Sequence, residues 1–107
     1  MEWYIRLLIF FGLFKDMGKK VGSYTYEKST RPKKKLMTKV GGKTIHFGHT
    51  DYGHFKDKTG IWKSKDTNDK VKRKAYRDRH SKIMDKTGKP AYLDPKNPSY
   101  HAYRVLW

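Results

Sequence analysis

The segment 68–85 carries the clearest regular pattern in the sequence, and it constrains the fold more than any other stretch. Its apolar residues recur at the three- and four-residue spacing that places side chains on one face of an α-helix. Asn68 or Thr67 is expected to cap the start, because a short polar side chain accepts hydrogen bonds from the free N–H groups of the first turn. Gly88, shortly after Asp85, is the expected stop.

The predicted helix has a narrow apolar face and a cationic face. The apolar positions on one side are Val71, Ala75, Tyr76 and Ile83. On the opposite side we expect an outward row of cations formed by Lys70, Arg73, Lys74 and Arg77. Arg79 is the exception, because at about 100° per residue it falls inside the apolar stripe. A cation at that position needs an acidic or carbonyl partner, or must reach past the core to one.

Two short alternating segments flank Gly41-Gly42 and predict a β-hairpin. Residues 36–40 and 43–47 each place apolar and polar side chains on opposite faces, as half-buried strands do. Paired glycines favour a two-residue turn because both positions tolerate positive φ. The aromatic and glycine-rich segment 48–62 is expected to form loops and short strands whose rings cover the open side of this hairpin.

The closing segment 88–107 contains three prolines that keep residues 89–97 extended or turned. Asn97-Pro98 is a suitable cap and first-turn pair for a short helix with Ala102 and Val105 or Leu106 on one side. The Leu106-Trp107 step is expected to dock on the domain.

Positive charge dominates the chain and limits what it can bury. Lys and Arg total 26 against 10 Asp and Glu, a formal net charge of +16 over 107 residues. Hydrophobic residues make up 36%, which is too few for a generous core, although aromatic side chains bury a large area each. Such a chain repels itself unless a polyanionic or acidic partner compensates the charge. Cysteine is absent, which excludes disulfides and thiolate metal sites.

Residues 1–16 form an apolar N-terminal anchor segment, in which Arg6 and Lys15 balance Glu2 and Asp16. The unbroken apolar run 7–14 is far shorter than the roughly 20 residues of a membrane-spanning helix. Two interpretations stay open. The segment either anchors the protein on a membrane surface or in a partner groove, or packs on its own domain.

Residues 17–35 are expected to form a basic linker arm that lies across a partner, although Tyr24 and Tyr26 alternate around Thr25 as in a short strand. Residues 36–107 are expected to form a small α+β domain. The predicted fold class is therefore α+β, with a small core of β-hairpin and short strands and one basic amphipathic helix. An extended N-terminal arm and a docked aromatic C-terminus complete this prediction.

The sequence contains no clear pattern of catalytic or metal-binding residues. His46, His49 and His54 lie near Asp51, but their spacing matches none of the common zinc sites, and ordinary hydrogen-bonding roles are preferred. The aspartates are scattered and mostly adjacent to lysines, which suits local charge balance. The chain has neither a Walker glycine loop nor a nucleophile elbow. We therefore predict a protein without enzymatic activity, cofactor or metal.

Three short motifs follow one another in residues 36–107. They are His46-Phe47-Gly48 after the predicted strand–turn–strand unit, Tyr76 with Arg79-His80 in the predicted helix, and Leu106-Trp107 at the aromatic end. In this order they resemble a family of short basic proteins encoded by nucleocytoplasmic large DNA viruses. The resemblance covers residues 36–107 and not the apolar start. It implies a component of the virion and no catalytic residue.

The primary hypothesis is a minor capsid, or cement, protein of a large icosahedral DNA virus, located in the virion on the inner face of the capsid shell. It would bridge capsomers by contact with the major capsid protein and other minor capsid proteins, with a contact of residues 1–16 to an internal membrane as a further option. The alternative is a sequence-nonspecific DNA-binding or DNA-condensing virion protein.

The candidate residues for partner binding are of two kinds. The basic candidates are Lys19, Lys20, Arg31, Lys33, Lys34, Lys35, Lys70, Arg73, Lys74 and Arg77. The apolar and aromatic candidates are Trp3, Tyr4, Ile5, Leu8, Phe10, Phe11, Phe14 and Trp107.

Overall fold

The computed structural model describes residues 18–107. The expected anchor segment and its candidate residues lie outside the described residues: Trp3, Tyr4, Ile5, Leu8, Phe10, Phe11 and Phe14. The described chain is mixed α+β, as the sequence predicts. The strands are β1 (Lys19–Val21), β2 (Tyr24–Lys28), β3 (Lys34–Val40) and β4 (Lys43–His49). The helices are α2 (Lys70–His80) and α3 (Pro98–Val105), with short 3-10 turns η1 (Lys63–Lys65) and η2 (Ala91–Leu93).

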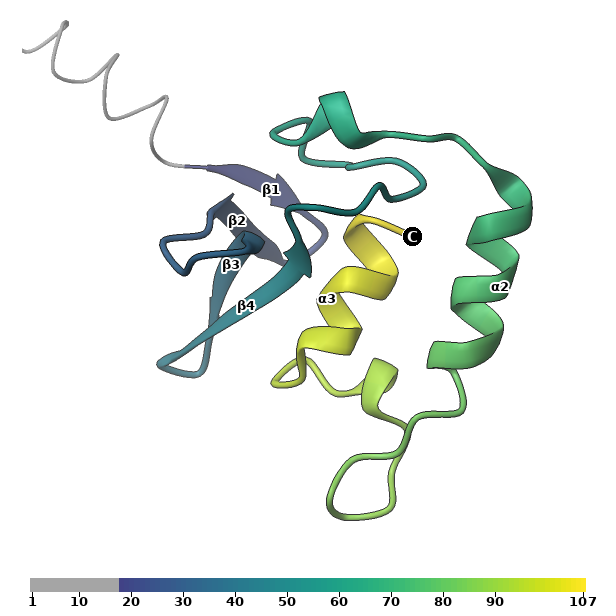
Figure 1. The fold of residues 1–107 in the computed structure, drawn as a ribbon. Coiled ribbons are helices and arrows are strands. Elements are labelled where there is room, and N and C mark those ends of the chain that lie inside the picture. Colours follow the sequence, from purple (N-terminus) through teal and green to yellow (C-terminus); the bar gives the residue numbers. More distant parts are fainter. Residues whose placement is uncertain (1–17) are drawn as a thin grey trace, which may run out of the picture.

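The sheet is an antiparallel meander in the order β1-β2-β3-β4 (Figure 1). Its central hairpin joins β3 to β4 and places Leu36 opposite Phe47. Gly41 and Gly42 occupy the turn with φ angles of 56° and 82°, a conformation that glycine adopts without a Cβ clash. The predicted hairpin and its turn are confirmed.

The basic segment 17–35 is not a linker arm, because its described residues contain β1 and β2. These strands pair across a two-residue turn at Gly22-Ser23, and Glu27 of β2 pairs with Met37 of β3. The alternation of a strand places Tyr26 inside the domain, at 1% exposure, while the charged side chains beside it stay exposed. Strand pairing therefore satisfies the backbone of β1 and β2 while Lys19, Lys20 and Lys28 stay exposed.

The core lies between one face of the sheet and α3. Six residues form its main cluster: Tyr26, Leu36, Phe47, Ala102, Val105 and Leu106. Helix α3 lies between the sheet and α2 (Figure 1). Asn97 caps α3 by accepting from the N–H of Ser99 at 3.0 Å, with Pro98 as the first helical residue. The predicted cap and the inward face of this helix are confirmed.

Helix α2 is present but begins later than expected. Its cap is Asp69, whose carboxylate accepts from the N–H groups of Val71 and Lys72. Asn68 instead has a positive φ of 54°, and the hydroxyl of Thr67 donates to the main-chain oxygen of His54 at 2.9 Å. Asp69 is the cap because a carboxylate is as good an N-cap as an amide, and its negative charge also interacts favourably with the positive end of the helix dipole.

Helix α2 also ends before the predicted stop at Gly88. Its last residue is His80, and the chain then turns back on itself. The N–H of Ala91 donates to the main-chain oxygen of Ile83 at 2.9 Å, and Met84 forms an isolated bridge with Pro90. These contacts replace further helical hydrogen bonds, so Ile83 never joins the helix face on which the sequence pattern placed it.

Candidate functional site

Arg73 and Arg77 of α2 point toward the C-terminal residues. Each donates from Nε to the main-chain oxygen of Trp107, at 2.9 and 3.0 Å respectively. Their guanidinium carbons lie 4.6 Å from the ring centroids of Phe55 and Tyr103. A guanidinium bonds well to oxygen and packs on aromatic faces, so both side chains can point inward. The expectation that these two cations face outward is wrong, and instead they hold α2 on the domain.

Tyr76 completes the inner face of α2. Its ring stacks between His80, at a centroid distance of 3.8 Å, and Trp107, at 4.3 Å. Burial raises the pKa of Tyr76 to about 12. Val71, by contrast, is 80% exposed, and Ala75 is also exposed. The buried face of the helix is therefore offset from the predicted apolar stripe, because aromatic and guanidinium contacts outweigh two small aliphatic side chains.

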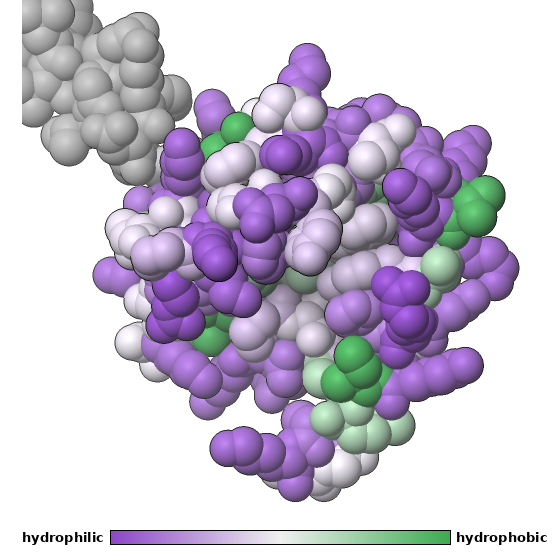
Figure 2. Space-filling view, in the orientation of Figure 1, coloured by the Kyte–Doolittle hydropathy of each residue, from purple (hydrophilic) through white to green (hydrophobic). Residues whose placement is uncertain are grey.

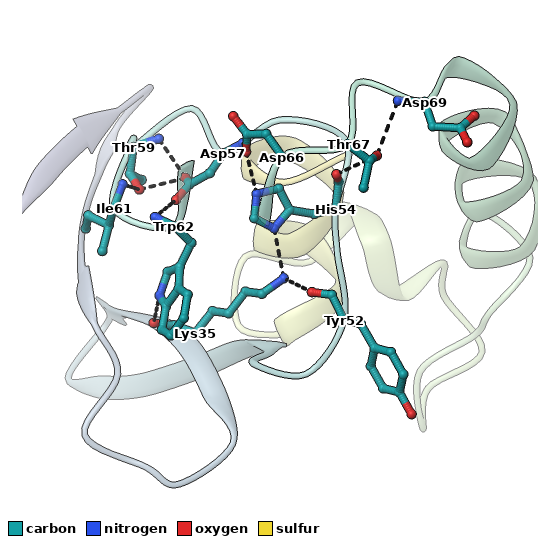
Figure 3. Close-up of polar contacts among 10 residues, drawn as sticks. All are labelled: Lys35, Tyr52, His54, Asp57, Thr59, Ile61, Trp62, Asp66, Thr67 and Asp69. Carbon is teal, nitrogen blue, oxygen red and sulfur yellow. Dashed lines mark hydrogen bonds and ion pairs between the residues drawn. The ribbon is translucent and has the colours of Figure 1, made fainter. Parts of the chain in front are cut away.

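A chain of buried polar groups connects β3 to the loop between β4 and α2 (Figure 3). Lys35 is 1% exposed, and its Nζ donates to the main-chain oxygen of Tyr52 and, at 2.8 Å, to Nδ1 of His54. His54 Nε2 lies 2.6 Å from Oδ1 of Asp66, which also accepts from the N–H of Asp57 at 2.8 Å. The prediction that Lys35 contacts an external partner is wrong, because its ammonium group is enclosed.

These partners fix the protonation state of His54. Lys35 can only donate, so Nδ1 must accept, and the ring proton lies on Nε2 and is donated to Asp66. Burial and then the positive charge of Lys35 lower the pKa of His54, and the hydrogen bond to Asp66 opposes the shift only in part. Burial and the nearby Lys65 lower the pKa of Lys35 to about 8. His54 is therefore a neutral bridge between a cation and a carboxylate.

Asp57 shapes the next part of the same loop. Its carboxylate accepts from the N–H groups of Thr59 and Trp62, both at 2.8 Å, and from the Thr59 hydroxyl at 2.6 Å. The indole of Trp62 donates to the main-chain oxygen of Lys35 at 2.8 Å and packs against the core. The loop between β4 and α2 is thus ordered mainly by buried polar contacts. Trp62 is one of the rings that the sequence predicts to cover the hairpin.

A second buried histidine joins α3 to the sheet. His101 is 0% exposed, and its Nε2 lies 2.6 Å from the main-chain oxygen of Pro95, which can only accept. The proton is therefore on Nε2, and Nδ1 accepts from the hydroxyl of Tyr26 at 2.8 Å. Burial lowers the pKa of His101 and raises that of Tyr26 above its ordinary value. Both groups are held in their neutral forms.

The domain is expected to lose stability as the pH falls below about 6.5. The folded pKa values of His54 and His101 lie below the ordinary value of 6.5, so the unfolded chain takes up protons first. Their stabilising contribution is complete above that pH and is lost as the pH falls through the folded pKa values. Urea denaturation followed by circular dichroism should give a midpoint that decreases from neutral to mildly acidic pH. A midpoint unchanged over that range would contradict these two assignments.

The remaining histidines of the expected cluster have separate partners. His46 Nδ1 lies 2.7 Å from the hydroxyl of Ser29, and His49 Nδ1 accepts from the N–H of Asp51 at 3.1 Å. In the part of the chain that the structure describes, no group of three or more His, Cys, Asp or Glu side chains is arranged to hold a metal ion. These side chains serve hydrogen bonds within strands and turns.

A cationic and aromatic pocket lies beside α2, and we refer to it below as the α2 pocket. It has a volume of about 490 Å³ and lies between α2, the ends of β3 and β4, the following loop and the C-terminal residues. Its cationic lining residues are Lys34, Lys35, Lys72 and Arg79, and its ring-bearing lining residues are His49, Tyr52, Tyr76, His80 and Trp107. No Asp or Glu is among the residues of 18–107 that line the pocket.

Residues from each of the three short motifs noted in the sequence meet in the α2 pocket. Gly48, the pair Arg79-His80 with Tyr76, and the pair Leu106-Trp107 all line it, although they lie far apart in the sequence. Of these, sequence reasoning chose only Trp107 as a candidate site residue. Arg79 was noted as a cation on the wrong face of the helix. It is exposed at the pocket edge, so it does not need the acidic or carbonyl partner that its expected burial required.

The carboxylates of the described residues are used mainly by backbone N–H groups. Five aspartates accept from main-chain amides: Asp57, Asp66, Asp69, Asp85 and Asp94. Among residues 18–107, Lys74 with Asp78, at 2.7 Å, is the one ion pair between a Lys or Arg and an Asp or Glu side chain. Asp78 therefore forms the expected local pair directly, whereas the five aspartates named above bond to main-chain amides. The face of the molecule that Figure 2 shows is mostly hydrophilic, with small separate hydrophobic patches.

The other basic candidates lie on two sides of the molecule. Lys19 and Lys20 are exposed on β1, Arg31 and Lys33 are exposed in the turn between β2 and β3, and the half-buried Lys34 begins β3. Lys70 and Lys74 are exposed on α2, on the other side of α3 from the sheet (Figure 1). The structure therefore does not bring the predicted basic residues into one patch.

No protein-family model, curated protein or solved structure matches the chain. Within residues 18–107, none of the helices has the length and apolar character needed to cross a membrane.

Proposed function

We propose that this protein is a non-enzymatic minor capsid protein of a large icosahedral DNA virus that attaches to acidic surfaces of neighbouring capsid proteins. The observation that supports the proposal best is the uncompensated positive charge of the described residues. Most of their aspartates accept from main-chain N–H groups, and Lys74 is the one Lys or Arg among them that pairs with an Asp or Glu side chain. The exposed cations therefore require anions from outside this part of the chain.

The arrangement of the cations suits an adaptor between two neighbours. Exposed lysines occur on β1 and on α2, and the sheet and α2 lie on opposite sides of α3 (Figure 1). A protein that bridges capsomers needs contact surfaces on more than one side. The resemblance of residues 36–107 to a viral family supplies the virion as the setting, on the inner face of the shell. The proposal includes an internal membrane or a capsomer groove as the partner of residues 1–16.

Charge reversal on either side of the domain is expected to reduce incorporation into virus particles several-fold. One variant is Lys19→Glu with Lys20→Glu on the sheet side, and the other is Lys70→Glu with Lys74→Glu on the helix side. Each change replaces attraction to an acidic surface by repulsion. Quantitative mass spectrometry of purified particles measures the incorporated amount. The matched control, Lys19→Arg with Lys20→Arg, keeps the charge and should be incorporated normally.

Two outcomes would overturn the proposal. The first is the absence of the wild-type protein from purified particles. The second is normal incorporation of both charge-reversal variants, verified as folded by circular dichroism. Either result would remove the link between exposed cations and capsid contact.

The second candidate is sequence-nonspecific DNA binding, and the same unpaired cations favour it. It predicts affinity for unrelated duplexes that falls steeply as salt rises, because neutralised phosphates release counterions. Lys35, Arg73 and Arg77 do not contribute, since their side chains are enclosed or bonded within the domain. Fluorescence anisotropy across salt concentrations decides this candidate, and an absence of binding at low salt eliminates it.

A further inference from the structure

We propose that the α2 pocket binds a nucleotide unit, that is, a planar base that carries a phosphate group. Its volume of about 490 Å³ lies within the range of small-molecule sites in proteins. This inference goes beyond the proposed capsid role, because it concerns one defined cavity and a ligand different from an acidic capsid surface. Each proposal can therefore fail without the other.

The cations of the pocket provide the phosphate contact. Lys34 comes from the start of β3, whereas Lys72 and Arg79 lie about two turns apart on α2, so positive groups line the cavity from two elements. Arg79 is exposed and has no Asp or Glu side chain within ion-pair distance among the described residues. Lys and Arg side chains that line one cavity without a competing Asp or Glu are a usual means of holding a phosphate.

The rings of the pocket provide the surface for a base. Tyr52, which is 67% exposed, packs against His49 at a centroid distance of 4.8 Å and is the most open ring of the pocket. Tyr76 is covered on both faces by His80 and Trp107, so in this column a base can stack only on the outer rings, His80 or Trp107. Bases stack on such rings whatever their sequence, and stacking combined with cations is typical of sites for single-stranded nucleic acid.

His80 supplies an independent sign of an unfilled contact. Its Nδ1 is the one buried side-chain nitrogen or oxygen without a hydrogen-bond partner in residues 18–107. Buried polar atoms are almost always paired, and leaving one unpaired is unfavourable. Because His80 lines the pocket, a rotation of its ring toward the cavity would allow it to bond to an edge of the base.

A nucleotide fits these observations better than an acidic peptide does. A carboxylate side chain would use Lys34, Lys72 and Arg79 but would leave the aromatic wall and the unpaired nitrogen without a role. A base with a phosphate uses all three features. The structure is equally compatible with a free nucleotide and with one residue of a single strand, and the experiment separates these sources.

The test is NMR titration of the ¹⁵N-labelled full chain with four probes: adenosine monophosphate, a short oligothymidylate, inorganic phosphate and polyglutamate. Adenosine monophosphate and oligothymidylate are expected to shift the signals of pocket residues, including the Trp107 indole. Tighter binding of oligothymidylate would identify a strand as the source, and tighter binding of adenosine monophosphate a free nucleotide. Equal or tighter binding of inorganic phosphate or polyglutamate at the same residues would overturn the proposal.

Two variants test whether a cation of the pocket contributes more to nucleotide affinity than a cation elsewhere on the surface. Arg79→Gln is expected to lower the affinity for adenosine monophosphate about tenfold, which corresponds to the loss of one charge-assisted contact. Lys86→Gln removes the same charge from an exposed turn outside the pocket and should stay within about twofold of wild type. Equal affinity losses in both variants would indicate a general charge effect and would also overturn the proposal.

Discussion

Replacement of Asp66 by alanine is expected to lower the free energy of unfolding by about 3–5 kcal/mol. The change leaves the Nε2–H of His54 and the N–H of Asp57 without their acceptor in the interior. It also removes one of the two carboxylates near the buried Lys35, the other being Asp57. A domain of this size has roughly 5–13 kcal/mol of stability in total, so the loss is a large fraction. Urea denaturation monitored by circular dichroism measures it.

The matched control is Asp78→Ala. Asp78 is exposed, and its carboxylate contacts Lys74 on the surface of α2. An exposed pair of this kind is screened by solvent, so this variant should unfold close to wild type. If the two variants lost similar amounts of stability, the buried chain from Lys35 to Asp66 would not have the structural role that its geometry indicates.

Replacement of Gly48 by alanine is expected to cost about 2–4 kcal/mol. Gly48 has a φ of 77°, and a Cβ there would lie 3.0 Å from Cδ1 of Leu106 and 3.1 Å from Cβ of Lys35. Both neighbours are fully buried and cannot move away freely. The glycine of the His46-Phe47-Gly48 motif is therefore required where β4 passes the Leu106-Trp107 step. Thermal and urea unfolding measure the loss.

Gly88→Ala separates backbone strain from packing. Gly88 has a similar φ of 83°, but nothing lies within 4 Å of the position of its Cβ. This variant should lose only the conformational part, about 1–2 kcal/mol. An equal loss in Gly48→Ala and Gly88→Ala would show that close packing against Leu106 has no role.

The hairpin and the C-terminal helix could be predicted because their signals are local. Gly41-Gly42 specifies its own turn, and Asn97-Pro98 specifies its own helix start, whatever the rest of the chain does. Strand β1 was missed, and β2 was noted only as a short strand within a basic arm, for the opposite reason. The lysines around Tyr24 and Tyr26 make the segment look like a solvated arm, whereas the partner that orders it is β3, which the local sequence does not indicate.

The inner face of α2 could not be predicted from the helix alone. Arg73 and Arg77 were assigned outward because they are charged, but their partners are the rings of Phe55 and Tyr103 and the main-chain oxygen of Trp107. Those partners come from distant segments. An arginine in a chain rich in aromatic residues can pack inward against their rings, and a hydropathy scale does not include this contact.

The residues of the α2 pocket could be predicted from the sequence only in part. Trp107 and Lys34 were named from composition and position, and His80 only as part of the motif with Tyr76 and Arg79, whereas Lys72 and Tyr52 had no signal that distinguished them from neighbouring residues. Arg79 did have such a signal, because it is a single cation within the expected apolar face of the helix. Such a residue indicates either that this face is not fully buried or that the cation binds a partner. The buried Lys35–His54–Asp66 chain joins residues 19 and 12 positions apart and has no local signature.

The central claim is that the exposed cations of this protein are neutralised by carboxylates of neighbouring capsid proteins. The most direct measurement is zero-length carbodiimide cross-linking of purified virus particles, which joins lysine amines only to carboxylates in direct contact, followed by mass spectrometry. The account predicts cross-links from Lys19, Lys20 or Lys33 on the sheet side and from Lys70 on α2 to acidic residues of the major or minor capsid proteins. Cross-links confined to this chain, in particles that contain it, would contradict the account.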